Sequence, residues 1–287
     1  MDNSLAWAAL YGHEGVVRIL LSQDDIEPDK PNENGRTPLS LVACRGHEEV
    51  VRMLLGRNDV NPNKADSNGQ TPLWWAARYG NDGVAKLLLA RDGINPDKPD
   101  NHGRIPLLWA ACFGNEEVVK ILLGQDDIDP NEQGESGQTP LFLAARNGHS
   151  GVVEMLLGRD DINPNKSNMD GDTPLLIAAK KGHEGVVRML LGRDDVNPNG
   201  QWLHKKTPLM WAASNGHEGV VKMLLGRSDI DPNRPDFYGE TPLLWAIRGG
   251  NEGVVKLLLG RDDINPTSPI RATIHLFSGL LAEGMRK

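Results

Sequence analysis

Two recurring residue patterns in this chain contain side chains that could take part in catalysis or bind a metal ion. One is histidine directly after glycine, and the other is a pair of adjacent aspartates. Histidine could ligate zinc or move protons. The histidines that follow a glycine are separated by one repeat interval or by a whole number of such intervals. They are His13, His47, His149, His183 and His217. A zinc site needs several ligands around one ion, so a position repeated along the chain predicts a structural role instead. His102 and His204 align with each other three repeats apart and cannot share an ion either.

The paired carboxylates could bind calcium or act as a general acid and base. They are Asp24-Asp25, Asp126-Asp127, Asp160-Asp161, Asp194-Asp195 and Asp262-Asp263, and an arginine precedes three of these pairs. Because the pattern repeats identically, it favours a ladder of Arg and Asp side chains that close turns. No phosphate-binding loop, nucleophile elbow or metalloprotease signature occurs. The sequence therefore predicts no catalytic residue, no metal and no cofactor.

The elements that must position these residues begin at a Thr-Pro-Leu pattern, which recurs with an unchanging period of about 34 residues. Its first residues are Thr37, Thr71, Ile105, Thr139, Thr173, Thr207 and Thr241. Threonine caps a helix start, and proline fits the first helical position. The glycine nine residues later predicts a left-handed helix stop. Each copy should thus begin with a short helix of about ten residues, and Ile105 should lack a cap.

A second helix is predicted in the other half of each copy, as in residues 46–56. Val50, Val51, Leu54 and Leu55 share one face at helical spacing. An acid and a base four residues apart, such as Glu48 and Arg52, recur on the outer face. A segment rich in Asn, Pro, Asp and Gly then leads to the next copy. This segment argues against tetratricopeptide repeats, which have the same period of about 34 residues but are nearly all helix.

The patterns Gly69-Gln70-Thr71-Pro72-Leu73 and Asn147-Gly148-His149, with the Ala and Val/Leu pairs that follow them, strongly resemble the ankyrin repeat. The resemblance covers about residues 3–274 and implies an all-α solenoid of paired antiparallel helices with projecting turns, called fingers here. The link after the second helix is shorter than usual, and the segment before the finger is longer. This variant of the repeat resembles the arrays of multidomain fungal signalling proteins.

The repeat register divides the chain into three parts. Residues 1–36 should form a partial or capping N-terminal repeat. Residues 37–274 should form seven repeats that start at residues 37, 71, 105, 139, 173, 207 and 241. Residues 275–287 break the pattern and should form a degenerate C-terminal cap or tail. One finger departs from the others, because Lys205 replaces the usual turn glycine; we expect either a reshaped turn or a strained left-handed residue.

Positions that vary while the frame repeats are the candidates for partner contacts. In the ankyrin family such positions line a concave groove and the finger tips. By this resemblance, the candidate partner-binding residues are Tyr11, Arg45, Trp74, Arg78, Tyr79, His102, Arg104, Phe113, Phe142, Arg146, Asn147, Lys180, Lys181, His204, Tyr238 and Arg248. Arg, Tyr and Trp are enriched at interface hot spots. The tryptophans at the position of Trp75 are instead predicted to pack between repeats, with a ligand cage as the alternative.

Composition narrows the classes of function. The net charge of −8 argues against a sequence-independent nucleic-acid binder. No apolar run has membrane-spanning length, and no signal peptide is visible. Cys44 and Cys112 occupy the same repeat position too far apart for a disulfide, which fits a reducing compartment. We expect a monomeric cytoplasmic protein.

The function that these observations favour is a non-catalytic scaffold that binds a protein or peptide segment in its groove. The basic and aromatic candidate positions predict a partner with acidic and apolar side chains. Two alternatives stay open. One is a small-molecule binder or enzyme that uses the aromatic groove, and the other is a passive spacer without a partner.

Overall fold

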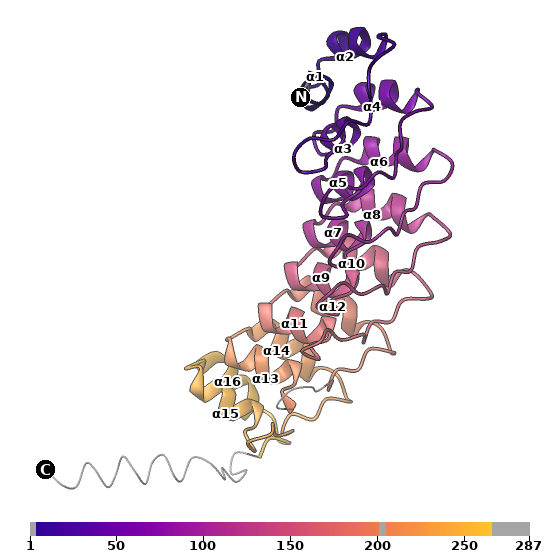
Figure 1. The fold of residues 1–287 in the computed structure, drawn as a ribbon. Helices are drawn as coiled ribbons and strands as arrows, with labels where there is room; N and C mark the ends of the chain where they lie inside the picture. The colour runs from indigo at the N-terminus through magenta and orange to yellow at the C-terminus, as the bar shows by residue number, and fades with distance from the viewer. Residues whose placement is uncertain (1–3, 201–204, 266–287) are drawn as a thin grey trace, which may run out of the picture. The chain divides into compact units, whose positions relative to one another are not determined.

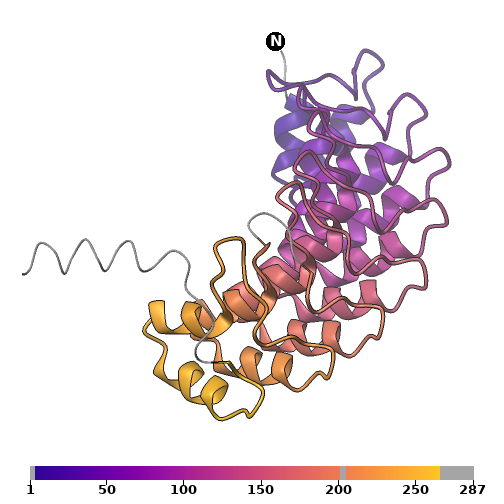
Figure 2. The same cartoon turned by 90° about the horizontal axis from the view of Figure 1, so that it is seen from below.

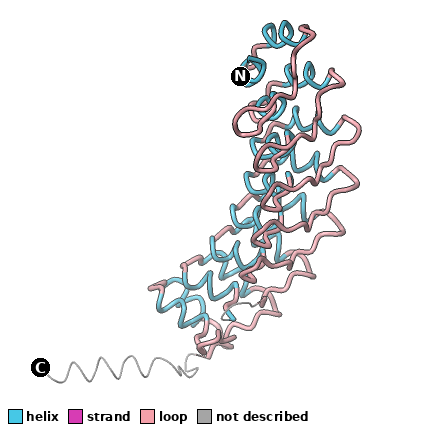
Figure 3. The backbone as a smooth tube through the Cα atoms, in the orientation of Figure 1, coloured by secondary structure: helices cyan, strands magenta, loops and turns pink. Residues whose placement is uncertain are grey.

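A computed structural model describes residues 4–200 and 205–265. These residues form sixteen helices and no strand (Figures 1 and 3). The chain divides into two compact units, residues 1–162 and 163–287. The expected all-helical repeat architecture is confirmed. The prediction for residues 275–287 lies outside the described residues.

The first helices of the repeats begin where the Thr-Pro-Leu pattern predicts. They are α1 (Ser4–Leu10), α3 (Pro38–Ala43), α5 (Pro72–Tyr79), α7 (Pro106–Phe113), α9 (Pro140–Asn147), α11 (Pro174–Lys181), α13 (Pro208–Ser214) and α15 (Pro242–Arg248). The Thr71 hydroxyl accepts the Trp74 backbone N–H, and four other threonines cap in the same way. Ile105 gives no side-chain cap, as expected. The glycine nine residues after each start has a positive φ, which confirms the predicted stop.

The second helices bury one apolar face each. They are α2 (Glu14–Leu21), α4 (Glu48–Leu55), α6 (Asp82–Leu89), α8 (Glu116–Leu123), α10 (Ser150–Leu157), α12 (Glu184–Leu191), α14 (Glu218–Leu225) and α16 (Glu252–Leu259). In α4, the side chains of Val50, Val51 and Leu54 are fully buried, whereas the Glu48–Arg52 ion pair is exposed. The helical periodicity thus separates core from solvent as predicted.

Within each unit, like helices pack against like. In the first unit α1, α3, α5, α7 and α9 contact one another in order, and α2 to α10 form a second row (Figures 1 and 2). In the second unit α11, α13 and α15 form one row, and α12, α14 and α16 form the other. Because every first helix lies beside the next, its variable side chains share a face within each unit.

The recurrent histidines join neighbouring repeats. His149 Nε2 lies 3.0 Å from the Cys112 carbonyl oxygen, and His217 Nε2 lies 3.1 Å from that of Lys180. Asn115 takes the same position and donates Nδ2 to the Ala77 oxygen at 2.8 Å. An amide can replace the imidazole here because either side chain can donate a hydrogen bond to a backbone carbonyl oxygen at the end of a helix. The predicted structural role is confirmed for these residues.

The predicted ladder of Arg and Asp side chains is present on the outer side of the repeats. Arg159 forms two bonds of 2.7–2.8 Å with the Asp161 carboxylate and donates Nη1 to the Leu123 oxygen at 2.9 Å. Arg57, Arg193, Arg227 and Arg261 pair in the same way with the aspartate two residues later. The arginine holds the pKa of its aspartate below the usual range, as at Asp161. No group of three potential metal ligands occurs among the described residues.

Candidate functional site

The C-terminal ends of the first helices carry the exposed variable side chains. In the first unit these are Tyr11, Arg45, Arg78, Tyr79 and Phe113, which we call the helix-end surface. Tyr11, Tyr79 and Phe113 are 59%, 55% and 47% exposed. A left-handed glycine follows each of these positions within two residues, so the side chains lie at the rim of the repeat.

Each exposed ring is supported by a tryptophan one helical turn earlier. The Trp109 and Phe113 ring centroids are 5.6 Å apart with planes 14° from parallel, and Trp75–Tyr79 and Trp7–Tyr11 are similar. Residues four apart on a helix are neighbours, so this stacking follows from the sequence spacing. Stacked rings are held rigidly and lose little side-chain entropy when a partner covers them.

Arg78 lies among these rings. Its guanidinium carbon is 4.4 Å from the Trp109 centroid and 5.1 Å from that of Phe113, and it is 5.9 Å from the Tyr79 centroid. Cation–π attraction orients the guanidinium against the indole face. Arg78 remains partly exposed, so a positive charge is fixed between two exposed aromatic rings.

Two predicted groove residues are buried instead. Trp74 is 1% exposed and Phe142 is 2% exposed, so the expectation that they face a partner is wrong. Trp74 packs edge-on against Trp75 and Trp109, with centroids 4.9 and 5.2 Å away. The residue after Thr-Pro-Leu points into the core in neighbouring copies as well, where it is Ser40, Leu108, Leu176 or Met210. A side chain at this position contributes to packing between repeats.

The tryptophans at the Trp75 position take part in this packing, as predicted. Trp211 and Trp245, one repeat apart, have ring centroids 6.2 Å from each other. Trp75 donates its indole N–H to the Asp66 carboxylate at 3.3 Å and is 5% exposed. Trp7 differs, because 56% of it is exposed.

A pocket of about 240 Å³ lies between α7, α9 and the adjoining finger of the first unit. Its lining includes Arg104, Trp109, Cys112, Gln138 and Arg146. Arg104 is held by the buried Asp100 carboxylate at 2.8 Å, and its guanidinium lies 5.0 Å from the Trp109 centroid. Arg146 Nη1 donates to Gln138 Oε1 at 3.4 Å. The predicted residues Arg104 and Arg146 therefore meet in one pocket, and Asn147 lies beside it, donating to the Cys112 oxygen at 2.7 Å.

The finger residues separate into two kinds. In the first unit His102 Nδ1 lies 2.9 Å from Glu135 Oε2, so neighbouring fingers are joined by a polar contact. In the second unit Tyr238 and Phe237 pack edge to face, and both are more than half exposed. Met169, on another finger of that unit, is 72% exposed. His204 lies outside the described residues.

In the second unit, Lys180 and Lys206 take repeat positions that carry Arg146 and Arg104 in the first unit. Lys180 Nζ lies 4.0 Å from the Trp211 centroid, and Lys206 Nζ lies 4.3 Å from that of Trp245. Lys181 is exposed. Arg248 pairs with the buried Glu240 carboxylate at 2.5 Å, which neutralises its charge locally.

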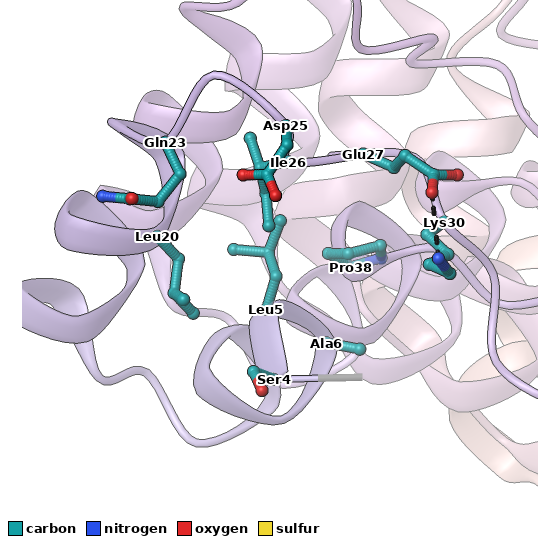
Figure 4. A pocket seen from close by; sticks show the side chains of 10 residues that line it. All are labelled: Ser4, Leu5, Ala6, Leu20, Gln23, Asp25, Ile26, Glu27, Lys30 and Pro38. Carbon is teal, nitrogen blue, oxygen red and sulfur yellow. Dashed lines mark hydrogen bonds and ion pairs between the residues drawn. The ribbon is translucent and has the colours of Figure 1, made fainter. Parts of the chain in front are cut away.

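Another pocket, of about 350 Å³, lies beside α1 and α2 (Figure 4). Leu5 and Ile26 point toward one another in it, and the Glu27–Lys30 ion pair of 2.9 Å lies at its edge. None of the predicted partner-binding residues lines it.

Elsewhere in the first unit, burial raises the pKa of the Cys44 thiol, which disfavours a reactive thiolate.

Comparison with known proteins agrees with this architecture. The sequence model of the family described as ankyrin repeats (three copies) matches residues 2–66, 55–134, 107–201 and 193–269. The chain belongs to the ankyrin repeat family. Ankyrin repeats generally act in protein–protein interaction and are typically non-catalytic. No curated protein matches the chain. No helix among the described residues has the length and apolar character needed to cross a bilayer.

Sequence reasoning missed two parts of this surface. It favoured packing over a ligand cage for Trp109 and did not list Trp109 among the partner-binding residues, although Trp109 also lines the pocket with Arg104 and Arg146. It did not single out Met169 and Phe237, whose exposure makes the second-unit fingers apolar. The sequence did contain a signal for this exposure. Finger tips are turns that project from the repeat, so an apolar side chain there cannot be buried in the core of its own repeat.

Proposed function

We propose that this ankyrin-repeat protein binds a protein or peptide segment through the helix-end surface and the adjoining pocket of its first unit. The partner segment carries acidic and apolar side chains. The protein acts as a cytoplasmic, monomeric recognition scaffold without catalytic activity or a cofactor. The observation that carries the proposal is the position of Arg78, held against Trp109 between the exposed rings of Tyr79 and Phe113.

Charge and shape support an acidic, apolar partner. The variable positions at these helix ends carry Arg45, Arg78 and Arg146 but no acidic side chain, although the whole chain has a net charge of −8. A carboxylate reaching Arg78 would form charge-assisted hydrogen bonds at a site already partly desolvated by rings. Apolar side chains beside it would cover Tyr79 and Phe113. Rigid aromatic and arginine anchors of this kind supply most of the binding energy at interfaces.

The alternative of a small-molecule site at the pocket beside Trp109 has weaker support. The pocket beside Trp109 measures about 240 Å³, below the roughly 300–1,000 Å³ of typical ligand pockets. The arginines that line it already have protein partners at Asp100 and Gln138. A surface contact by a partner's side chains suits this geometry better than an enclosed ligand.

Selection from a random peptide library tests the proposal. We expect selected peptides to place Asp or Glu next to aromatic or aliphatic residues. Their affinity should fall at least about tenfold on Arg45→Glu combined with Tyr79→Ala, because both side chains are exposed hot-spot types. The matched control is Lys181→Glu, an equivalent exposed charge change in the second unit, which should leave binding intact. Selected peptides that ignore the first-unit changes would exclude the helix-end surface as the site.

A further inference from the structure

A ladder of asparagine side chains joins the long loops of successive repeats. At the same position of several repeats, an Asn donates its Nδ2 to a backbone oxygen in the loop of the next repeat. The donors are Asn63, Asn131, Asn165, Asn199 and Asn233, and the bonds are 2.5–2.7 Å long. The side-chain oxygen of Asn63 also accepts the Asn95 backbone N–H at 3.2 Å. A primary amide fits because it offers a donor and an acceptor together.

Two rungs of this ladder carry an aspartate in place of asparagine. Asp29 and Asp97 occupy the same register, and their Oδ2 atoms accept the backbone N–H groups of Asn61 at 2.7 Å and Asp129 at 3.3 Å. The other carboxylate oxygen, Oδ1, is buried in both residues and has no hydrogen-bond partner. An ionised carboxylate accepts but cannot donate, so the bond that Asn makes to the next repeat cannot form.

The repeat register predicts which group these oxygens face. In the complete rungs the acceptor lies thirty residues after the Asn, as Gly93 follows Asn63. The corresponding residues after Asp29 and Asp97 are Asp59 and Asp127. A carboxylate oxygen and a carbonyl oxygen both carry negative charge, so they repel when no proton or donor lies between them. Leaving a buried polar atom unsatisfied in this way is unfavourable.

The surroundings of the two carboxylates oppose ionisation. Burial is the main cause that raises the pKa of Asp97 to about 6; the charges of Glu132, Asp129 and Asp127 add to it, and the Asp129 N–H acts against it. Burial also raises the pKa of Asp29, helped by Asp59 and opposed by the Asn61 N–H and by Lys64. The Lys64 ammonium donates to the Asp29 backbone oxygen at 2.8 Å, and the Lys98 ammonium donates to the Asn63 oxygen.

We propose that Asp29 and Asp97 are proton-operated joints between neighbouring repeats. Each carboxyl takes up one proton from solvent, and its O–H then donates to the backbone oxygen of residue 59 or 127, as an Asn amide does at the other rungs. No other bond changes. Each joint gains this bond as the pH falls and loses it as the pH rises, so the first unit holds its repeats together in a pH-dependent way.

The sign of this effect distinguishes it from the rest of the molecule. A carboxyl whose pKa is raised by folding stabilises the folded state as pH falls toward and below that pKa, and the contribution is lost as pH rises through about 6 for Asp97. The Arg–Asp ladder behaves in the opposite way. The pKa values of Asp161 and Asp195 are lowered, so their contribution is lost in acid.

The test compares amide hydrogen exchange and carboxyl titration in the whole chain and its variants. Asp97→Asn should restore the complete rung and slow local opening around residues 127–131 by at least about tenfold at pH 7.5. A shift of one pKa unit corresponds to about this factor, and we count only part of the Asp97 shift because the side chain is partly exposed to solvent. The difference from the parent should shrink toward pH 5. Asn131→Asp should produce the reverse, with faster opening at pH 7.5 that acid corrects.

Asp126→Asn is the matched control, because it removes an exposed acid from the same loop without changing a rung. The proposal is overturned if the Asp97 carboxyl titrates near its ordinary value of about 4, or if Asp97→Asn and Asp126→Asn slow opening equally. It is also overturned if millimolar calcium or magnesium at pH 7.5 protects the parent as Asp97→Asn does, because a metal ion then occupies the place assigned to the proton.

Discussion

The two units use the same repeat frame but differ in where they vary. In the first unit the helix ends carry arginines and stacked aromatic rings, and the fingers are joined by polar contacts such as His102–Glu135. In the second unit the helix ends carry Lys180 and Lys181, and the fingers present exposed apolar side chains. The distinctive exposed side chains therefore lie at the helix ends in the first unit and at the fingers in the second.

The outer ladders differ in parallel. Among its described residues, the second unit has an Arg–Asp pair at each of three rungs, from Arg193, Arg227 and Arg261. Its described Asn rungs, from Asn165, Asn199 and Asn233, are complete. In the first unit Gln23 and Gln125 replace two arginines, and Gly93 replaces the aspartate two residues after Arg91. Asp29 and Asp97 replace two asparagines. The unit with the more specialised surface has the less regular scaffold. Surface and scaffold residues lie on separate positions, so each can be changed without the other.

The strongest test of this comparison asks whether the units lose structure separately. Val153→Pro in α10 removes the bond from the residue 153 N–H to the His149 oxygen and should cost about 3 kcal/mol or more. Hydrogen exchange should then rise in the first unit near α9 and α10, with α14 and α16 still protected. Val221→Pro in α14 is the mirror variant, and it should expose the second unit instead. Equal loss of protection in both units for either variant would contradict a chain stabilised by neighbour contacts.

The next test concerns the two surfaces. Phe113→Ala should weaken binding of a selected acidic peptide by about 2 kcal/mol, roughly 30-fold, mainly through faster dissociation. Phe237→Ala removes an equally large exposed ring from a second-unit finger and should have little effect. Surface plasmon resonance at two salt concentrations separates dissociation from charge-steered association. A larger loss with Phe237→Ala would move the binding site to the apolar fingers.

Much of the fold could be predicted because each repeat carries the same residues at its helix starts and helix ends. Thr71 as cap, Pro72 in the first turn and Gly80 at the left-handed stop are fixed by backbone chemistry within a few residues. The same holds for Lys205, whose φ of 58° places it in the left-handed region that the missing glycine suggested. These features depend on neighbours in sequence, so one sequence is enough to find them.

The side-chain directions were harder to predict. Trp74 and Phe142 were placed on the surface by resemblance, yet both are buried, because the position after Thr-Pro-Leu packs against the next repeat. The apolar residues Leu108, Leu176 and Met210 at that position were a usable signal. In contrast, the placement of Arg78 over Trp109 depends on packing between the first helices of two successive repeats, which no local pattern states.

A smaller effect is expected from the irregular finger of the second unit. Lys205→Gly should stabilise the protein by up to about 1 kcal/mol, because glycine adopts the left-handed conformation without a Cβ clash. Gly103→Ala is the first-unit counterpart: its φ is 69°, and an added Cβ would meet only the Glu135 backbone nitrogen at 3.8 Å. It should therefore destabilise by a similar amount through backbone strain. Urea unfolding measures both, and an unchanged or lower midpoint for Lys205→Gly would show that no strain is stored there.

The smallest expected effect would make the first-unit ladder resemble that of the second. Gln125→Arg introduces an arginine two residues before Asp127, the spacing of Arg193 and Asp195. The new guanidinium should pair with the Asp127 carboxylate and reach the end of α6 in the preceding repeat, as Arg159 reaches Leu123. Because such pairs are exposed, we expect a gain of only about 0.5 kcal/mol, reduced by salt. Arg159→Gln should lose about as much in urea unfolding. If Gln125→Arg gives no gain while Arg159→Gln is costly, the rung depends on the local loop conformation rather than on the charge pair, and the interruption at Gln125 reflects a different loop.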